Sequence, residues 1–328
     1  MYNELYCSFL GYELKRWFSS KKTEQRLAAL AILDGQVKLM VAELRNERLA
    51  LMINDAVAVA DGALPHEYAL AIEQLLKHYQ RYLSSSTPLQ VVLAHRWYQA
   101  LNIPRPQVPA AELAASLKYA LRDLVAWAPD EMVCDYYELP VQSAGQDNIA
   151  VVVAEKSLLK LWAESISNYS VSIAGISTEE LFAAKFFTVE NKPNLTLWQA
   201  DNQPMLLQVA SNKGLLVSRY LRQFSNARAQ QGDNLTDLID NLAVEVQRSM
   251  DFHESQLKQA PIAKIRIAID HPQIEQVAQQ LQQQIGVTTV VERLPDWSLE
   301  LADPRYSDNL LIGALTQLTE QPLQESNG

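Results

Sequence analysis

The stretch that decides the fold reads NLTDLIDNLAVEVQRSMDF at residues 234–252 and KIRIAIDHPQ at residues 264–273. In the first part, apolar residues recur at helical spacing, which predicts one long amphipathic helix. Asn234 is a residue type that favours the N-cap, so we expect the helix to begin there. The alternating run at 264–269 predicts a strand. The strand leads into Asp270-His271-Pro272-Gln273, a turn that contains no glycine.

Strand and helix patterns recur in two similar sets along the rest of the chain. The first set opens with three strand-like runs, and Asp34-Gly35 between the first two is a strong hairpin signal. The expected strands are 27–33, 37–44, 48–54, 89–94, 97–103, 132–139, 149–154, 171–176, 195–200, 205–210, 215–221, 264–269 and 288–291. The expected helices are 65–83, 110–127, a helix ending near 168, 178–187, the long helix from 234, 272–285 and 308–318.

Three antiparallel strands followed by alternating helix and strand, twice over, is the order that an actin-like fold needs. The predicted fold class is therefore α/β: an actin-like (ribonuclease H-like) two-domain fold with two mixed sheets flanked by helices and a small inserted α+β subdomain. The expected division is a basic and aromatic segment at 1–26, a first half at 27–146 with the insertion at about 89–140, a second half with the closing helix at 147–320, and a frayed tail at 321–328.

Composition narrows the function classes. The 328 residues are 48% hydrophobic and carry a net charge of −10, which disfavours nucleic acid as a partner. Two cysteines far apart, no apolar run near the ~20 residues of a membrane span and no signal peptide predict a cytoplasmic protein. Only 10 glycines are present, so the chain has few to form phosphate-binding loops.

The N-terminal segment 1–26 is both aromatic and basic. A segment of this kind can lie on an anionic membrane surface, which predicts peripheral membrane contact. The alternatives are a loosely ordered lead-in and a helix that packs on its own domain. The residues behind this expectation are Phe9, Leu10, Tyr12, Leu14, Lys15, Arg16, Trp17, Phe18, Lys21, Lys22 and Arg26.

Four stretches, taken in order, carry a family resemblance. They are AELAASLKYALRDLVAWAPDEMVCDY at 111–136, the strand 149–154 with VSIAGISTE at 171–179, DNLAVEVQRSMDF at 240–252, and NLLIGAL at 309–315. Together they resemble the PilM family, the actin-like cytoplasmic proteins of type IV pilus assembly. The sequence is more similar to the MshI-type members, which serve mannose-sensitive haemagglutinin (MSHA) pilus biogenesis. The resemblance covers about residues 27–318.

The resemblance implies a partner and a location. It implies a non-enzymatic scaffold at the cytoplasmic face of the inner membrane, peripheral to that membrane. A groove beside the inserted subdomain, at about residues 95–140, would accept the cytoplasmic tail of a PilN/MshJ-like inner-membrane protein, as peptide-in-groove docking needs no nucleotide. The sequence leaves a homodimer open. A more distant resemblance is to the cytoplasmic domain of a type II secretion protein.

The nucleotide site of the family has three glycine-bearing turns, and this sequence departs from each. The first turn keeps Asp34, Gly35 and Lys38 but is shortened to a plain hairpin. The second, Asp201-Asn202-Gln203-Pro204, has no glycine, and its proline lacks the N–H that a phosphate would use. The third is the glycine-free turn that begins at Asp270. We therefore expect weak or no ATP binding, no hydrolysis and no cofactor.

Glu245 and Arg248 match the helix pair that contacts adenosine in actin-like ATPases. They could equally be a solvated ion pair at i,i+3 spacing, which contributes ~0.2–0.5 kcal/mol. The alternative function is an actin-like ATPase whose ATP state gates partner binding. The residual positions for ATP and Mg²⁺ would then be Asp34, Gly35, Lys38, Asp201, Glu245, Arg248 and Asp270.

No other chemistry is indicated. The sequence contains no GxSxG, no Walker A motif and no Cys–His signature. The five histidines show none of the spacings of metal sites, so no catalytic residue and no metal site are expected; they are His66, His78, His95, His253 and His271.

Overall fold

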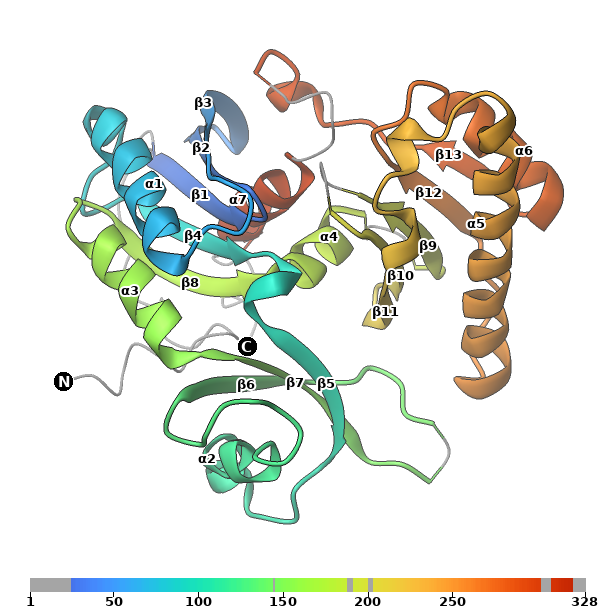
Figure 1. Cartoon of the computed structure of the whole chain (residues 1–328), viewed down its shortest axis with the longest axis horizontal. Coiled ribbons are helices and arrows are strands. Elements are labelled where there is room, and N and C mark those ends of the chain that lie inside the picture. Colours follow the sequence, from blue (N-terminus) through green and yellow to red (C-terminus); the bar gives the residue numbers. More distant parts are fainter. Residues whose placement is uncertain (1–24, 144, 188–190, 200–202, 302–307, 321–328) are drawn as a thin grey trace. The chain divides into compact units, whose positions relative to one another are not determined.

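The computed structural model describes residues 25–143, 145–187, 191–199, 203–301 and 308–320 (Figure 1). Its strands are β1 (Gln25–Leu33), β2 (Gln36–Arg45), β3 (Arg48–Ala58), β4 (Pro88–Leu93), β5 (Gln99–Pro104), β6 (Met132–Glu138), β7 (Asn148–Glu155), β8 (Ser172–Thr178), β9 (Asn194–Trp198), β10 (Met205–Ser211), β11 (Gly214–Leu221), β12 (Lys264–Ala268) and β13 (Thr289–Val291).

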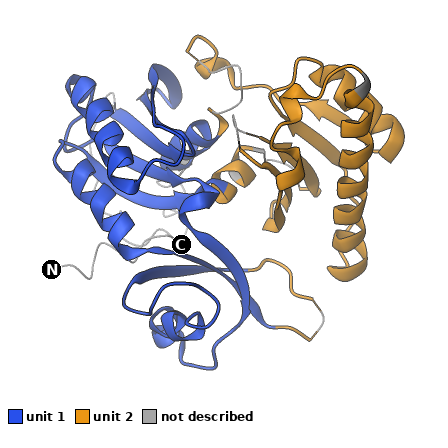
Figure 2. Cartoon of the chain, viewed as in Figure 1, with its two compact units in different colours: residues 1–138, 147–179, 310–328 blue, residues 139–146, 180–309 orange. Residues whose placement is uncertain are grey.

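Its α-helices are α1 (Pro65–His78), α2 (Ala110–Ala120), α3 (Lys156–Ser167), α4 (Glu179–Phe187), α5 (Asp233–Asp251), α6 (Ile274–Ile285) and α7 (Asn309–Glu320). The short helical turns used below are η1 (Gln80–Tyr82), η2 (His95–Trp97), η3 (Arg222–Phe224), η4 (Ala227–Ala229) and the π-helical turn η5 (Phe252–Gln256). The chain forms two compact units (Figure 2): unit 1 is 1–138, 147–179 and 310–328, and unit 2 is 139–146 and 180–309.

The main sheet of unit 1 has the strand order β3-β2-β1-β4-β8. Residues 27–33 of β1 are buried without interruption, as expected for a strand that is covered on both faces. β1 and β2 are joined by the predicted two-residue hairpin, where Leu33 lies opposite Gln36 and Gly35 has a φ of +76°. A positive φ costs glycine little, which explains the glycine there. Helices α1 and α3 pack against each other.

A small sheet with the order β5-β7-β6 also belongs to unit 1. One face of this sheet and helix α2 share an apolar core, whose fully buried members are Leu117, Leu121, Met132, Ile149, Val151 and Val153. The predicted inserted α+β subdomain is therefore present: β5, α2 and β6 lie between β4 and β7 in sequence, and β7 is the central strand of the small sheet.

Unit 2 repeats the strand order of unit 1 as β11-β10-β9-β12-β13. In both sheets the first three strands in sequence are antiparallel and the last two join in parallel. Helices α5 and α6 cover one face, and the apolar stripe of α5 packs on the sheet through Leu238, Ile239, Leu242 and Val246. Both five-stranded sheets thus have the same strand order. This is the duplication of the actin-like fold that the pattern of elements predicts.

The predicted division at 146/147 is wrong. β7 and α3 are part of unit 1, and β8 pairs in parallel with β4, so unit 2 proper begins at Glu180. The insertion also starts later than residue 89, because β4 pairs with β1 in the main sheet. Both errors arise because strand periodicity identifies a strand without identifying its partner.

Several helix ends also differ from expectation, and α1 ends at His78 rather than at 83. α2 ends at Ala120 rather than at 127, and the following residues form turns around the buried Leu121. α5 begins after Gly232, which has a φ of +63° and stands at the N-cap instead of Asn234. The expectations for residues 1–24, Asp201 and the tail 321–328 lie outside the described residues. In the part of the chain that is described, no helix is both long and apolar enough to cross a membrane.

Candidate functional site

The β1–β2 hairpin holds the first set of predicted nucleotide positions, Asp34 and Gly35. The Asp34 carboxylate is ion-paired with the guanidinium of Arg96. The Gly35 N–H donates to the Tyr68 hydroxyl at 3.1 Å, and the Gly35 carbonyl accepts from the N–H of Val59 at 2.8 Å. The N–H that a phosphate would use is thus already bonded to a side chain of α1.

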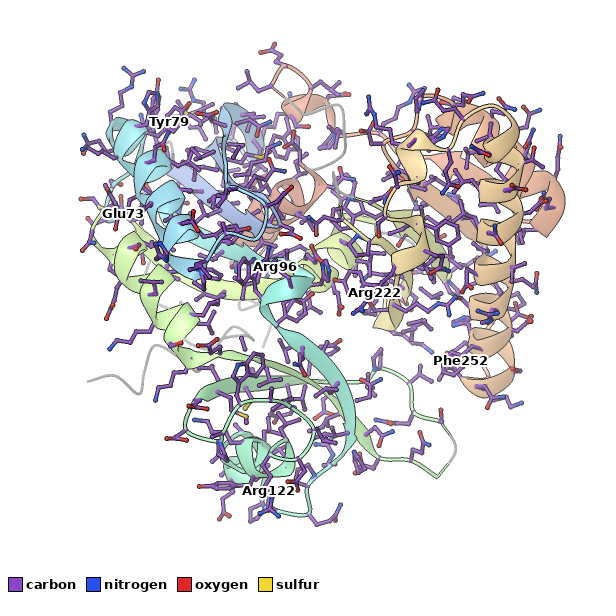
Figure 3. The ribbon with its side chains drawn as sticks, viewed as in Figure 1. Glu73, Tyr79, Arg96, Arg122, Arg222 and Phe252 are labelled. Atoms are coloured by element: carbon purple, nitrogen blue, oxygen red, sulfur yellow. The ribbon has the colours of Figure 1, made fainter. Side chains whose placement is uncertain are left out.

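Arg96 is held in place by an aromatic cluster made of Tyr68, Trp97 and Trp162. Its guanidinium carbon lies 4.3 Å from the Trp97 ring centroid, a cation–π distance. The Trp97 ring meets Tyr68 and Trp162 edge-on, at centroid distances of 4.8 and 4.9 Å. Trp162 is fixed in turn because its Nε1–H donates to the Pro65 carbonyl at 3.0 Å. Arg96 is labelled in Figure 3, in the turn between β4 and β5.

Lys38, the third position of the first turn, lies apart from this arrangement in the ladder of β2. It is opposite Ala31 on β1 and Ala56 on β3, and only 4% of it is exposed. The other two positions predicted for this turn, Asp34 and Gly35, lie together at the tip of the hairpin, whereas Lys38 lies within the sheet.

Glu245 and Arg248 are brought together in α5, but they serve a contact that the sequence did not reveal. Arg248 Nη1 donates to Glu245 Oε1 at 2.7 Å, and the other carboxylate oxygen is ion-paired with Arg219 of β11. Arg219 Nη2 also donates to the Glu245 carbonyl at 3.0 Å. The Glu245 side chain is only 12% exposed, so it ties α5 to the edge strand of the sheet. Glu245 is therefore more than one half of a solvated ion pair with Arg248, because it also binds Arg219.

The turn that begins at Asp270 is also filled by the chain itself. The Asp270 carboxylate is ion-paired with Arg228 of η4. His271 is 5% exposed; its Nδ1 accepts the Gln273 N–H at 3.0 Å, and its Nε2 lies 2.9 Å from the Gln230 carbonyl. Since Nδ1 accepts, Nε2 carries the hydrogen and donates. The His271 side chain thus closes this glycine-free turn.

At the start of the second turn, too, a side chain of the protein forms hydrogen bonds within the chain. Gln199 follows β9, and its Nε2 donates to the carbonyls of Gln203 at 2.9 Å and Phe224 at 2.7 Å. Asp201, the predicted position in this turn, is outside the described residues. Sequence reasoning missed Arg96, Arg219, Arg228 and Gln199, because the partners of the three arginines lie 62, 26 and 42 residues away.

Among the described residues, no group of three or more His, Cys, Asp or Glu side chains could hold a metal ion. A hollow of about 400 Å³ opens between β3 and α1, and none of the predicted positions lines it; its lining is Asp55, Val57, Gln74, Leu75, Lys77 and His78. In the described part of these turns, polar groups at Gly35, Gln199 and His271 are hydrogen-bonded within the chain.

His253, in the π-helical turn η5, is expected to make the stability of unit 2 depend on pH. Burial lowers the pKa of His253 from its usual range, although its bond to the Ala260 carbonyl at 3.0 Å opposes the shift. Its Nδ1 is buried and has no hydrogen-bond partner. The folded chain therefore binds fewer protons at this ring than the unfolded chain, and the free energy of unfolding falls as pH drops below the unfolded pKa of ~6.5.

We expect His253→Gln to lose part of this acid sensitivity. The measurement is the free energy of unfolding by urea at about pH 7.5 and about pH 5.5. Wild type and the control His66→Gln, at an exposed position, should lose the same amount on acidification, and His253→Gln should lose less. Equal losses in all three proteins would show that His253 is not the group responsible.

Known proteins that are similar to this chain are found by comparing structures and not by comparing sequences. Neither a protein-family model nor a curated protein matches the sequence. A structure of a PilM-PilN type IV pilus biogenesis complex superimposes with a TM-score of 0.62 at 16% identity, covering 92% of this chain and 98% of that one. A Bacteroides thetaiotaomicron protein with an actin-like ATPase fold and unknown function gives 0.52 at 10% identity, covering 89% and 96%.

A third structure, the cytoplasmic domain of EpsL from the type II secretion system of Vibrio cholerae, covers 92% of this chain and 96% of that one. Its TM-score is 0.48 at 12% identity, too low to carry an argument. The two TM-scores above 0.5 and the repeated strand order indicate the same fold. The chain therefore has the actin-like fold, with the small inserted subdomain in its first half.

Proposed function

We propose that this protein is a non-enzymatic scaffold of a type IV pilus assembly platform. It works in the cytoplasm at the inner membrane, and it is of the MshI type that serves MSHA pilus biogenesis. The observation that carries the proposal is the likeness to the PilM-PilN structure along 92% of the chain. The sequence resemblance at 111–136 and 240–252 supports the same family.

The proposed partner is the cytoplasmic tail of a PilN/MshJ-like inner-membrane protein. The small sheet offers two outer strands, β5 and β6, on either side of β7. An outer strand has one row of N–H and C=O groups that no neighbouring strand uses, and an extended peptide can add to it. β5 is mostly exposed, so it is the edge that we expect the tail to approach.

The scaffold is proposed to work without ATP. Support comes from Gly35, Gln199 and His271, where polar groups of the predicted turns are bonded within the chain. A charge-assisted hydrogen bond to phosphate contributes roughly 1.5–3 kcal/mol. Losing three or four such donors weakens binding by at least ~10³-fold at 1.4 kcal/mol per decade.

Hydrogen–deuterium exchange of the full chain, with and without a synthetic tail of the partner, tests the docking proposal. We expect the tail to slow exchange in β5, α2 and β6, and to leave α5 and α6 unchanged as internal controls. A tail of scrambled sequence should protect neither region. Protection confined to unit 2, or no protection at saturating tail, would contradict the proposal.

A further inference from the structure

Two arginines and a tyrosine converge beside the unit 1 sheet, at the end of β1 opposite to the Asp34-Gly35 hairpin. Arg26 is the second residue of β1, and Arg81 and Tyr82 end the turn η1 that follows α1. The guanidinium carbon of Arg81 lies 4.8 Å from the Tyr82 ring centroid, and that of Arg26 lies 5.7 Å from the same centroid. These three residues are called the Tyr82 site below.

Neither arginine has a carboxylate partner among the described residues. Arg26 Nη1 donates to the Arg81 carbonyl at 3.3 Å, and Arg81 Nη2 donates to the Tyr82 hydroxyl at 3.0 Å. Glu43 lies opposite Arg26 on β2, but it is ion-paired with Arg45 at 2.5 Å. Two like charges near one ring repel each other, so a bound anion would stabilise the arrangement.

We propose that the Tyr82 site binds the phosphate of an anionic phospholipid headgroup and holds unit 1 against the membrane surface. A guanidinium presents five N–H donors that match phosphate geometry, and among the described residues most of those on Arg26 and Arg81 have no acceptor. The Tyr82 hydroxyl accepts from Arg81 and keeps its own hydrogen to donate. Tyrosine suits an interface, because its ring is apolar and its hydroxyl is polar.

A lipid surface fits this site better than a free anion does, because the basic charge continues along the sequence. Lys21 and Lys22 come five and four residues before Arg26. The whole chain has a net charge of −10, so an anionic membrane repels most of it and attracts a local basic cluster.

Co-sedimentation of the full-length protein with vesicles tests this proposal independently of tail docking, because no partner is added. Wild type should bind vesicles of phosphatidylcholine with phosphatidylglycerol, and not phosphatidylcholine alone, and added salt should weaken the binding. Arg26→Gln with Arg81→Gln should lower the partition coefficient by about 30-fold, from ~1 kcal/mol per basic group at 1.4 kcal/mol per decade.

Two control proteins separate site chemistry from folding. Arg122→Gln with Lys160→Gln removes the same charge from exposed residues that are paired with Asp123 and Glu164, and binding should stay within ~2-fold of wild type. Arg26→Lys with Arg81→Lys keeps the charge but removes the guanidinium donors, so binding should lie between that of wild type and that of the Gln pair.

Equal binding to both kinds of vesicle would overturn the proposal, as would unchanged binding in the Gln pair of the Tyr82 site. Loss of binding in the Lys pair as large as that in the Gln pair would also overturn it, because charge would then not be the cause. Competition by inorganic phosphate alone, at concentrations that leave ionic strength unchanged, would show a free-anion site and would overturn the assignment to lipid.

Discussion

Trp97→Ala is expected to lower the free energy of unfolding of unit 1 by about 3–5 kcal/mol, the range for removing a buried tryptophan. Trp97 is 7% exposed and lies between the rings of Tyr68 and Trp162. Edge-on ring pairs add ~0.5–1.5 kcal/mol each beyond the area they bury. The same substitution removes the ring under the Arg96 guanidinium, so the ion pair with Asp34 should weaken as well.

Urea unfolding followed by circular dichroism measures this effect. Tyr119→Ala is the matched control in the same unit, because that ring is 71% exposed, and it should change the free energy by no more than ~0.5 kcal/mol. If Trp97→Ala costs less than ~1 kcal/mol, the aromatic cluster does not hold the β4–β5 turn as described.

Glu245→Ala is expected to lower the free energy of unfolding of unit 2 by about 2–3 kcal/mol. Removal of one partner from a buried ion pair costs more than this, and the estimate is reduced because the Arg219 side chain is 32% exposed. Arg248→Ala should cost only ~0.5 kcal/mol or less, because that side chain is 63% exposed. A thermal melt of the three proteins measures the difference.

The two alanine variants also separate a structural role from an adenosine-binding role. If the pair served nucleotide, both substitutions would weaken ATP binding by similar factors and would change stability little. A large stability loss in Glu245→Ala alone is the result that follows from its contact with Arg219. Equal melting temperatures for Glu245→Ala and Arg248→Ala would contradict the structural role.

Local sequence patterns were sufficient for most elements of the fold. The hairpin at Asp34-Gly35, the long helix from about residue 234 and the order of strands all depend on neighbours within a few residues. Hydrophobic periodicity and turn chemistry report on that range. The two-set pattern then led to the actin-like class, which the repeated strand order confirms.

Long-range pairing is what the sequence could not supply. β7 and α3 follow a loop that resembles a domain boundary, yet β8 returns to pair with β4 across the inserted subdomain. The ion pairs of Arg96 and Arg228 join residues 62 and 42 positions apart. Nothing in the neighbouring sequence distinguishes such an arginine from a solvent-exposed one. The ion pairs that these turns make within the chain are therefore visible only in the three-dimensional structure.

Isothermal titration calorimetry of the purified protein with millimolar Mg-ATP tests the central claim most directly, supported by a melting curve. A ligand present at 100 times its dissociation constant would stabilise the protein by ~2.7 kcal/mol, which corresponds to a rise of several degrees at roughly 2–4 °C per kcal/mol. The proposed scaffold predicts no saturable heat and no shift in the melting temperature. Saturable heat together with a raised melting temperature would contradict it, and the ATPase that gates its partner by nucleotide state would then be the better account.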